Sequence, residues 1–168
     1  FDPAYVGMVH QLSANLPYFR LDYDAKGTED ILHLKHELEP EAMAAHPLFK
    51  SLHARATELV SEIYGPANPV LRRVHANQLP FGDIQLAHTD LVPGVTALYF
   101  ANAQWEDSWQ GEAVFYDAGE PVATVYPRPG RLALFPGDLP HRAGSPSKLC
   151  LAARISIVFK FQTDSQPD

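Results

Sequence analysis

The stretch PVATVYPRPGRLALFP, residues 121–136, places two short runs of aliphatic, aromatic and β-branched residues on either side of a Pro-Gly turn. Similar runs, bounded by Pro, Gly or Asp, continue through the sequence from Pro69 onward. The chain has 15 Pro and 10 Gly, and turn residues at this frequency suit many short strands. The predicted strands are Val70–Gln78, Ile84–His88, Val95–Ala101, Ala113–Tyr116, Pro121–Tyr126, Arg131–Phe135 and Leu151–Phe161.

Helical patterns precede this strand region. Between Glu41 and Tyr64 apolar residues recur at steps of three or four, and Gly65-Pro66 is a strong helix terminator. A shorter helix is expected at about Pro3–Asn15. The segment Arg20–Glu39 is interpreted as a loop with a possible edge strand, and as a possible substrate lid.

Helices followed by closely spaced strands favour an antiparallel two-sheet fold over an alternating βα fold. The expected class is mainly β with flanking α: a jelly roll backed by one or two N-terminal helices. A length of 168 residues suits one domain with one core. We therefore expect a single domain over 1–168, with helical support and the possible lid at about 1–66 and the jelly-roll core at about 69–162.

Charge and composition exclude several classes of partner. The chain carries 13 basic and 20 acidic residues, a net charge of −7, which argues against a nucleic-acid partner because such binding rests on neutralising phosphates. No apolar run approaches the roughly 20 residues of a membrane helix, so no membrane partner is expected. The single Cys150 and the lack of a signal peptide predict a reducing, cytoplasmic location. A small-molecule or peptide substrate is expected, and the oligomeric state is left open.

One spacing in the strand region points to a metal. His88-Thr89-Asp90 is followed by His141 after 50 intervening residues. Positions 88 and 90 leave the same face of an extended chain, and the turn before His141 can bring it across to them. Two imidazoles and one carboxylate leave three coordination positions open, as in non-haem Fe(II) oxygenases. The alternative for the His-x-Asp doublet alone is a strand-end histidine beside a turn aspartate.

Arg154 is the second unusual residue. The strand Leu151–Phe161 is apolar on both sides, because Arg154 and Ser156 share their face with Ala152 and Val158. A lone arginine in such a place needs an anion, and its planar group suits a carboxylate, with Ser156 adding a hydroxyl donor. The alternative is an internal salt bridge to one of the 20 acids.

The stretch from Arg73 to Phe161, about 90 of the 168 residues, resembles the Fe(II)- and 2-oxoglutarate-dependent dioxygenase superfamily, in particular its prolyl-4-hydroxylase-like branch. The matching pieces are Ala76-Asn77-Gln78, His88-Thr89-Asp90, Thr96–Asn102 with Trp105, Trp109–Phe115, and Tyr126–Phe135 leading to His141. The sequence departs from the family at two places: Gln110 replaces the first glycine of a Gly-Gly-Glu-like turn, and Gln78 stands where a tyrosine often contacts the cosubstrate.

The resemblance implies a double-stranded β-helix (jelly roll) and the cofactors Fe(II) and 2-oxoglutarate, with O2 as cosubstrate. It implies that His88, Asp90 and His141 are the iron ligands, and that Arg154 pairs with the distal carboxylate of 2-oxoglutarate. Further candidates for cosubstrate contacts are Asn77, Gln78, Tyr99 and Ser156. The implied reaction is hydroxylation of a C–H bond with release of succinate and CO2. Related halogenases lack the carboxylate ligand, so Asp90 argues against halogenation.

Two other readings stay open at the level of sequence. One is a cupin-like metal-binding β-barrel without 2-oxoglutarate chemistry, and the other is a non-catalytic module that recognises a peptide. The substrate is equally open among a free amino acid, a peptidyl prolyl-type residue, a carrier-bound acyl group and a small natural product.

Several further residues have weaker functional interpretations. Asp83 and Asp138 are considered as partners that orient the imidazoles, although exposed turn positions are favoured for both. A metal pair formed by His33 and His36 on a helix is considered, but a solvated face is favoured. Trp105 and Trp109 are expected to pack under the Gly111 turn, and Arg131 and Arg142 are reserve candidates for binding an acidic group of the substrate.

Overall fold

The computed structural model describes residues 1–65 and 69–163, and its N-terminal part contains three helices, with two short strands between the first and the second. The helices are α1 (Pro3–Ala14), α2 (Pro40–Ala45) and α3 (Pro47–Tyr64). The segment Glu41–Tyr64 is helical as predicted, but it forms two helices interrupted at His46 instead of one continuous helix. His46 adopts extended backbone and serves both as the C-cap of α2 and as the N-cap of α3, because Pro47 has no N–H to continue the first helix. Gly65 caps α3 at φ 96°, as predicted, and Pro66 lies outside the described residues.

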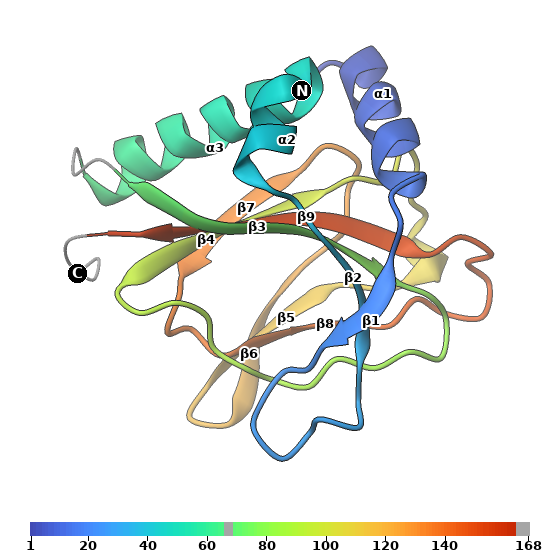
Figure 1. Cartoon of the computed structure of the whole chain (residues 1–168). Coiled ribbons are helices and arrows are strands. Elements are labelled where there is room, and N and C mark those ends of the chain that lie inside the picture. Colours follow the sequence, from blue (N-terminus) through green and yellow to red (C-terminus); the bar gives the residue numbers. More distant parts are fainter. Residues whose placement is uncertain (66–68, 164–168) are drawn as a thin grey trace.

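The strands form two antiparallel sheets (Figure 1). The six-stranded sheet has the order β1-β2-β3-β9-β4-β7, and the three-stranded sheet has the order β6-β5-β8. Their bounds are β1 (Phe19–Asp22), β2 (His33–Glu37), β3 (Val70–Leu79), β4 (Gly94–Phe100), β5 (Ala113–Asp117), β6 (Glu120–Val125), β7 (Leu132–Pro136), β8 (His141–Ala143) and β9 (Arg154–Gln162). The predicted architecture, two antiparallel sheets backed by N-terminal helices, is confirmed.

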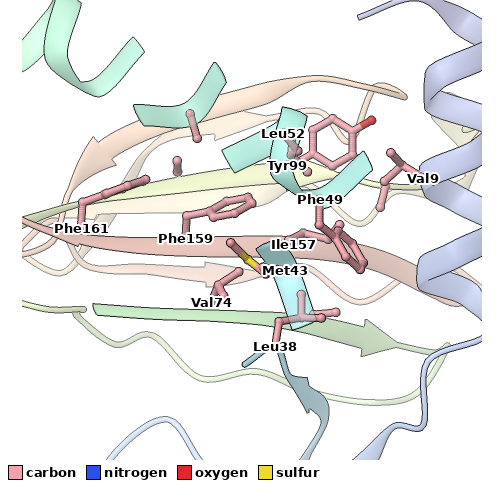
Figure 2. Close-up of a cluster of buried hydrophobic side chains, with 14 of the residues drawn as sticks. Val9, Leu38, Met43, Phe49, Leu52, Val74, Tyr99, Ile157, Phe159 and Phe161 are labelled. Carbon is pink, nitrogen blue, oxygen red and sulfur yellow. The ribbon is translucent and has the colours of Figure 1, made fainter. Parts of the chain in front are cut away.

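The strand β9 lies in the middle of the large sheet and separates two layers of packing. Its odd-numbered residues, among them Ile157 and Phe159, join a hydrophobic cluster with Leu52 of α3 and Val9 of α1 (Figure 2). Its even-numbered residues face the small sheet, where Val158 packs in a second cluster that includes residues of β4, β5 and β7. The helices thus cover one face of the large sheet, and the other face is left for the site (Figure 1).

One predicted strand is not formed and another begins later than predicted, both because of how the chain connects the two sheets. Ile84–His88 is not a strand: after β3 the chain turns at Pro80–Asp83 and crosses from one sheet to the other, and its only bridge in the described part of the chain is His88 to His141. The predicted strand Leu151–Phe161 begins only at Arg154, since β3 ends opposite Arg154 and β4 ends at Phe100. Leu151 is consequently 99% exposed.

Two short strands replace the predicted loop at Arg20–Glu39. β1 pairs with β2, and β1 forms an edge of the large sheet, so the possible edge strand is confirmed and accompanied by a second strand. β8, which the sequence did not predict, has three residues and pairs with β5. Among the described helices none is long and apolar enough to cross a membrane.

Candidate metal centre

The backbone brings His88 and His141 side by side between the two sheets. The two residues exchange backbone hydrogen bonds, His88 N–H to His141 O at 3.0 Å and His141 N–H to His88 O at 2.9 Å. The Asp90 N–H donates to Gly137 O at 2.6 Å, and this close approach requires glycine, because a Cβ at position 137 would lie 1.9 Å from the carbonyl oxygen of Leu91. The turn at Gly137 therefore brings Asp90 and His141 to one place, a role that the sequence predicted for His141 alone.

The donor atoms of these three residues converge. One donor atom from each of His88, Asp90 and His141 lies within 4.8 Å of the other two. The Nε2 atom of His88 lies 3.8 Å from Asp90 Oδ1, and that of His141 lies 3.6 Å from Asp90 Oδ2. Such a set can hold one divalent metal and leave coordination positions free.

Hydrogen bonds at the far side of each ring fix which nitrogen is available. Nδ1 of His88 lies 3.0 Å from Leu86 O, and Nδ1 of His141 lies 2.9 Å from Leu139 O. A carbonyl oxygen only accepts hydrogen bonds, so each Nδ1 carries the proton and each Nε2 presents a lone pair. Backbone carbonyls that orient ligating imidazoles in this way are typical of metal sites. The residues present therefore fit a metal.

Asp90 is held as a carboxylate by two neighbours. Thr96 Oγ1 donates to Oδ2 at 2.5 Å, and Lys160 Nζ forms an ion pair with Oδ1 at 2.6 Å. Burial alone would raise the pKa of Asp90, but the charges of Lys160 and His141 and the hydrogen bonds from Lys160 and Thr96 lower it below its ordinary value. Asp90 is therefore ionised at neutral pH, as a metal ligand must be.

Replacement of Thr96 by valine tests this orientation of Asp90. Thr96 is buried, and valine has nearly the same shape, so Thr96→Val removes the hydroxyl donor with little change in packing. We expect about a 10-fold loss of Mn(II) affinity, the lower end of the range for groups that orient metal ligands. Isothermal titration with Mn(II) measures it, with Thr124→Val on the exposed β6 as the control. Equal Mn(II) affinity in Thr96→Val and the wild type would show that the hydroxyl does not orient Asp90.

Arg154 lies in the same cavity and forms no salt bridge with the described residues; the charge of Glu112 acts on it only from beyond ion-pair distance. The residue is 2% exposed, and its Nε and Nη2 atoms have no hydrogen-bond partner within the described residues. Burial lowers the pKa of Arg154 to about 10, so the guanidinium remains charged at neutral pH. The guanidinium carbon lies 5.0 Å from the centre of the Phe100 ring. The alternative of an internal salt bridge is not found in the part of the chain that the structure describes.

The Gly111 turn supports Arg154 from the small-sheet side. Gly111 has φ 85°, and a Cβ there would lie 3.1 Å from the Trp105 ring and 3.3 Å from Arg154 Cδ. Trp105 packs against this turn and donates its indole N–H to Gln110 O at 2.8 Å, with Trp109 edge-on at 5.5 Å between ring centres. The predicted packing under Gly111 is confirmed for Trp105, whereas Trp109 contacts the Trp105 ring. Gln110, which replaces the first glycine of the family turn, takes φ 57°, a left-handed conformation that favours glycine.

A cavity of about 220 Å³ connects the two groups, and most of the other predicted cosubstrate contacts line it. Asn77, Gln78 and Ser156 do so together with His88, Asp90, His141 and Arg154. Asn77 lies directly opposite Ser156 in the β3–β9 ladder, and Asn77 Oδ1 is buried without a described hydrogen-bond partner.

Tyr99 is the exception, and its prediction is corrected. Thr96 and Leu98 of β4 line the cavity, whereas Tyr99 belongs to the hydrophobic cluster under the helices (Figure 2). Because side chains alternate along a strand, a residue three positions from Thr96 points to the opposite face. Tyr99 therefore cannot contact a cosubstrate held in this cavity.

The weaker candidates are not brought into the ligand set. Asp138 is exposed, and Asp83 contacts Arg20, so neither touches an imidazole. His33 and His36 lie on β2 rather than on a helix, three positions apart. His33 is buried against Asp24 and His36 lies near Pro17 O, so they do not form a metal pair, and the favoured solvated face was wrong for His33.

The arginines held in reserve have protein partners. Arg131 donates to Tyr126 O at 2.9 Å, and Arg142 Nε donates to the Tyr116 hydroxyl at 2.7 Å. Arg142 nevertheless lines the cavity. A role for Arg142 toward a substrate stays a prediction.

Sequence reasoning missed three lysine or arginine residues in the cavity and two acids. Lys160, Lys35 and Arg73 line it, the last two paired with acids of β1 and β2. Lys160 follows Arg154, Ser156 and Val158 at even spacing, so strand alternation contained the signal for it. The acids are Asp22, which ends β1 and pairs with Lys35 and Arg73, and Asp24, which comes from the loop between β1 and β2. No local sequence pattern indicates that Asp24 lies in the cavity.

Comparisons with known proteins place this geometry in a known fold. No family model and no curated protein sequence matches the chain. Among solved structures, a Pseudomonas putida prolyl-4-hydroxylase matches with a TM-score of 0.70 and 18% identity, covering 96% of this chain and 88% of that one. A Trichoplax adhaerens prolyl hydroxylase in complex with a hypoxia-inducible-factor peptide fragment matches at 0.69 and 17%, covering 96% and 78%.

A third structure, HygX from Streptomyces hygroscopicus with nickel and 2-oxoglutarate bound, matches at a TM-score of 0.68 and 15% identity, covering 98% of this chain and 80% of that one. All three alignments span nearly the whole chain, helices and both sheets included. The chain therefore has the jelly-roll fold of the prolyl-4-hydroxylase-like 2-oxoglutarate oxygenases, which confirms the fold that the sequence resemblance predicted.

Proposed function

We propose that the chain is an Fe(II)- and 2-oxoglutarate-dependent oxygenase that uses O2 to hydroxylate a C–H bond. One observation carries the proposal: a His-Asp-His donor set shares a single cavity with a buried arginine that forms no salt bridge and has two unpartnered nitrogens among the described residues. A metal site alone would suit many activities, but the additional cation suits a small metal-chelating acid. The fold that the chain shares with prolyl hydroxylase structures, and with HygX holding nickel and 2-oxoglutarate, supports the same proposal.

The proposed roles follow from the contacts described above. His88, Asp90 and His141 would hold Fe(II) through Nε2, a carboxylate oxygen and Nε2, respectively. Arg154 would pair with the distal carboxylate of 2-oxoglutarate, and Ser156 would add a hydroxyl donor. Asn77 and Gln78, which line the same cavity, would complete the polar contacts of the cosubstrate. When bound, iron with 2-oxoglutarate and O2 supplies the oxidation of the C–H bond, in which one oxygen atom enters the product and the other enters succinate as CO2 is released.

The residues around the donor set would then orient reactants and keep water out. Phe135 lies against His141 with 4.6 Å between ring centres, and Val158 and Leu98 form an apolar wall of the cavity. An apolar wall strengthens each electrostatic contact made inside the cavity. The substrate we propose is an amino acid, a peptidyl prolyl-type residue or a small natural product.

The test is 2-oxoglutarate consumption without added substrate. We expect slow Fe(II)-dependent release of succinate that stops when EDTA removes the metal, and a visible absorbance band when Fe(II) and 2-oxoglutarate are mixed with the protein without oxygen. The band reports chelation by the keto acid, which a metal-binding barrel of another class would not give. Metal binding without the band and without succinate would contradict the proposal.

A further inference from the structure

The segment that carries His88 is held by side chains instead of a strand ladder. Residues 84–88 run between the sheets, and the single bridge at His88 is their only sheet pairing among the described residues. Two side-chain contacts replace the missing ladder. Gln85 Oε1 accepts from Ala143 N–H at 2.7 Å, and the carboxylate of Asp24 accepts from Leu86 N–H at 2.5 Å.

Asp24 comes from the loop between β1 and β2, far from His88 in the sequence. In Figure 1 this loop lies on the same side of the large sheet as β5, β6 and β8, away from the helices. The Asp24 side chain is only 3% exposed. Besides Leu86, it contacts His33 Nε2 through Oδ2 at 2.9 Å and lies 3.2 Å from His88 Nδ1 through Oδ1. One buried carboxylate thus joins the loop, β2 and a proposed metal ligand.

We propose that Asp24 is a positioning residue that couples the β1–β2 loop to the metal centre through His88, an inference that rests on the proposed function. Its carboxylate faces the ring nitrogen that carries the proton, so it favours the tautomer in which Nε2 is free and makes Nε2 a better donor. The Leu86 contact fixes the backbone two residues before His88. Asp24 also anchors the loop, because its three partners lie outside the loop itself.

Coupling of this kind acts in both directions. If the anchored loop strengthens metal binding, then metal binding must stabilise the anchored loop by the same factor. A divalent ion near Asp24 also offsets the cost of burying its charge. The loop contains Lys26, an exposed residue after which trypsin can cut, so the rate of cleavage there measures how firmly the loop is anchored.

The experiment combines Mn(II) titration with trypsin cleavage at Lys26, followed by mass spectrometry. For Asp24→Asn we expect a 10- to 100-fold loss of Mn(II) affinity. The control is Asp30→Asn, at an exposed position of the same loop, and we expect its Mn(II) affinity to be unchanged. Saturating Mn(II) should slow cleavage after Lys26 in the wild type and in Asp30→Asn but not in Asp24→Asn. The wild-type protection needs no variant, so it tests the coupling even if Asp24→Asn misfolds.

The outcomes separate this inference from the proposed function. Wild-type protein that binds Mn(II) and shows the 2-oxoglutarate band, with Asp24→Asn binding Mn(II) equally well, would overturn the role of Asp24 alone. If Mn(II) did not change the rate of cleavage after Lys26 in the wild type, the coupling would also be overturned. Wild-type protein that binds no Mn(II) would overturn the metal centre itself and, with it, this inference.

Discussion

Substitution of His88 by alanine is expected to abolish Mn(II) binding and Fe(II)-dependent release of succinate. His88 supplies one of three converging donor atoms, and its backbone bridge to His141 does not depend on the imidazole. The fold should therefore survive while the ligand set is reduced to two. We expect at least a 100-fold loss of Mn(II) affinity by isothermal titration, with the far-UV circular dichroism unchanged.

The matched control is His36→Ala. His36 is a half-buried histidine of β2 that lies outside the cavity, with Nδ1 3.0 Å from Pro17 O. Mn(II) affinity in this variant should stay within twofold of the wild type. If His88→Ala bound Mn(II) as tightly as His36→Ala, the three-residue centre would be wrong, whatever the fold comparisons show.

The strands that could be predicted are those that the local sequence pattern alone defines. β3, β4, β5, β6 and β7 lie within two residues of their predicted bounds, because β-branched, aromatic and aliphatic residues in each are bounded by turn residues. Ile84–His88 has the same composition, but it crosses between sheets, and no local pattern distinguishes a crossing segment from a strand. β8 is three residues long and contains His141 and Arg142, too short and too polar to be recognised.

The site residues that could be predicted are those that a short stretch of sequence identifies. His88 and Asp90 form one short motif, and Arg154 interrupts a strand that is otherwise apolar on both faces. Asp24 gives no such signal, because its burial depends on where a loop folds back over the sheets. The prediction for Tyr99 failed because the resemblance identified the motif but did not show which of its alternating side chains face the cavity. Only the structure shows that Thr96 faces the cavity and that Tyr99 therefore faces the helices.

Substitution of Arg154 by methionine is expected to separate cosubstrate binding from metal binding. Methionine keeps an unbranched stem against Phe100 and Gly111 and removes the charge. Charge-assisted hydrogen bonds contribute about 1.5–3 kcal/mol each, so loss of two contacts to a carboxylate predicts a 100-fold or greater rise in the Kd of 2-oxoglutarate. The Kd of Mn(II) should change less than threefold, because Arg154 is not among the converging donors. Titration of the Mn(II)-loaded protein with 2-oxoglutarate measures the first value.

Stability distinguishes this role from a structural one. A buried guanidinium that served the fold would have protein partners, and its loss would lower the free energy of unfolding by several kcal/mol. Arg154 has two nitrogens without described partners, so removal of its charge should leave the free energy of unfolding in urea unchanged or raise it. Arg72→Met, at an exposed position of β3 where Nε donates to Gln162, should alter neither the Kd of 2-oxoglutarate nor stability. A variant Arg154→Met that unfolds more easily yet binds 2-oxoglutarate normally would make Arg154 a structural residue, and the anion would have to bind elsewhere in the cavity.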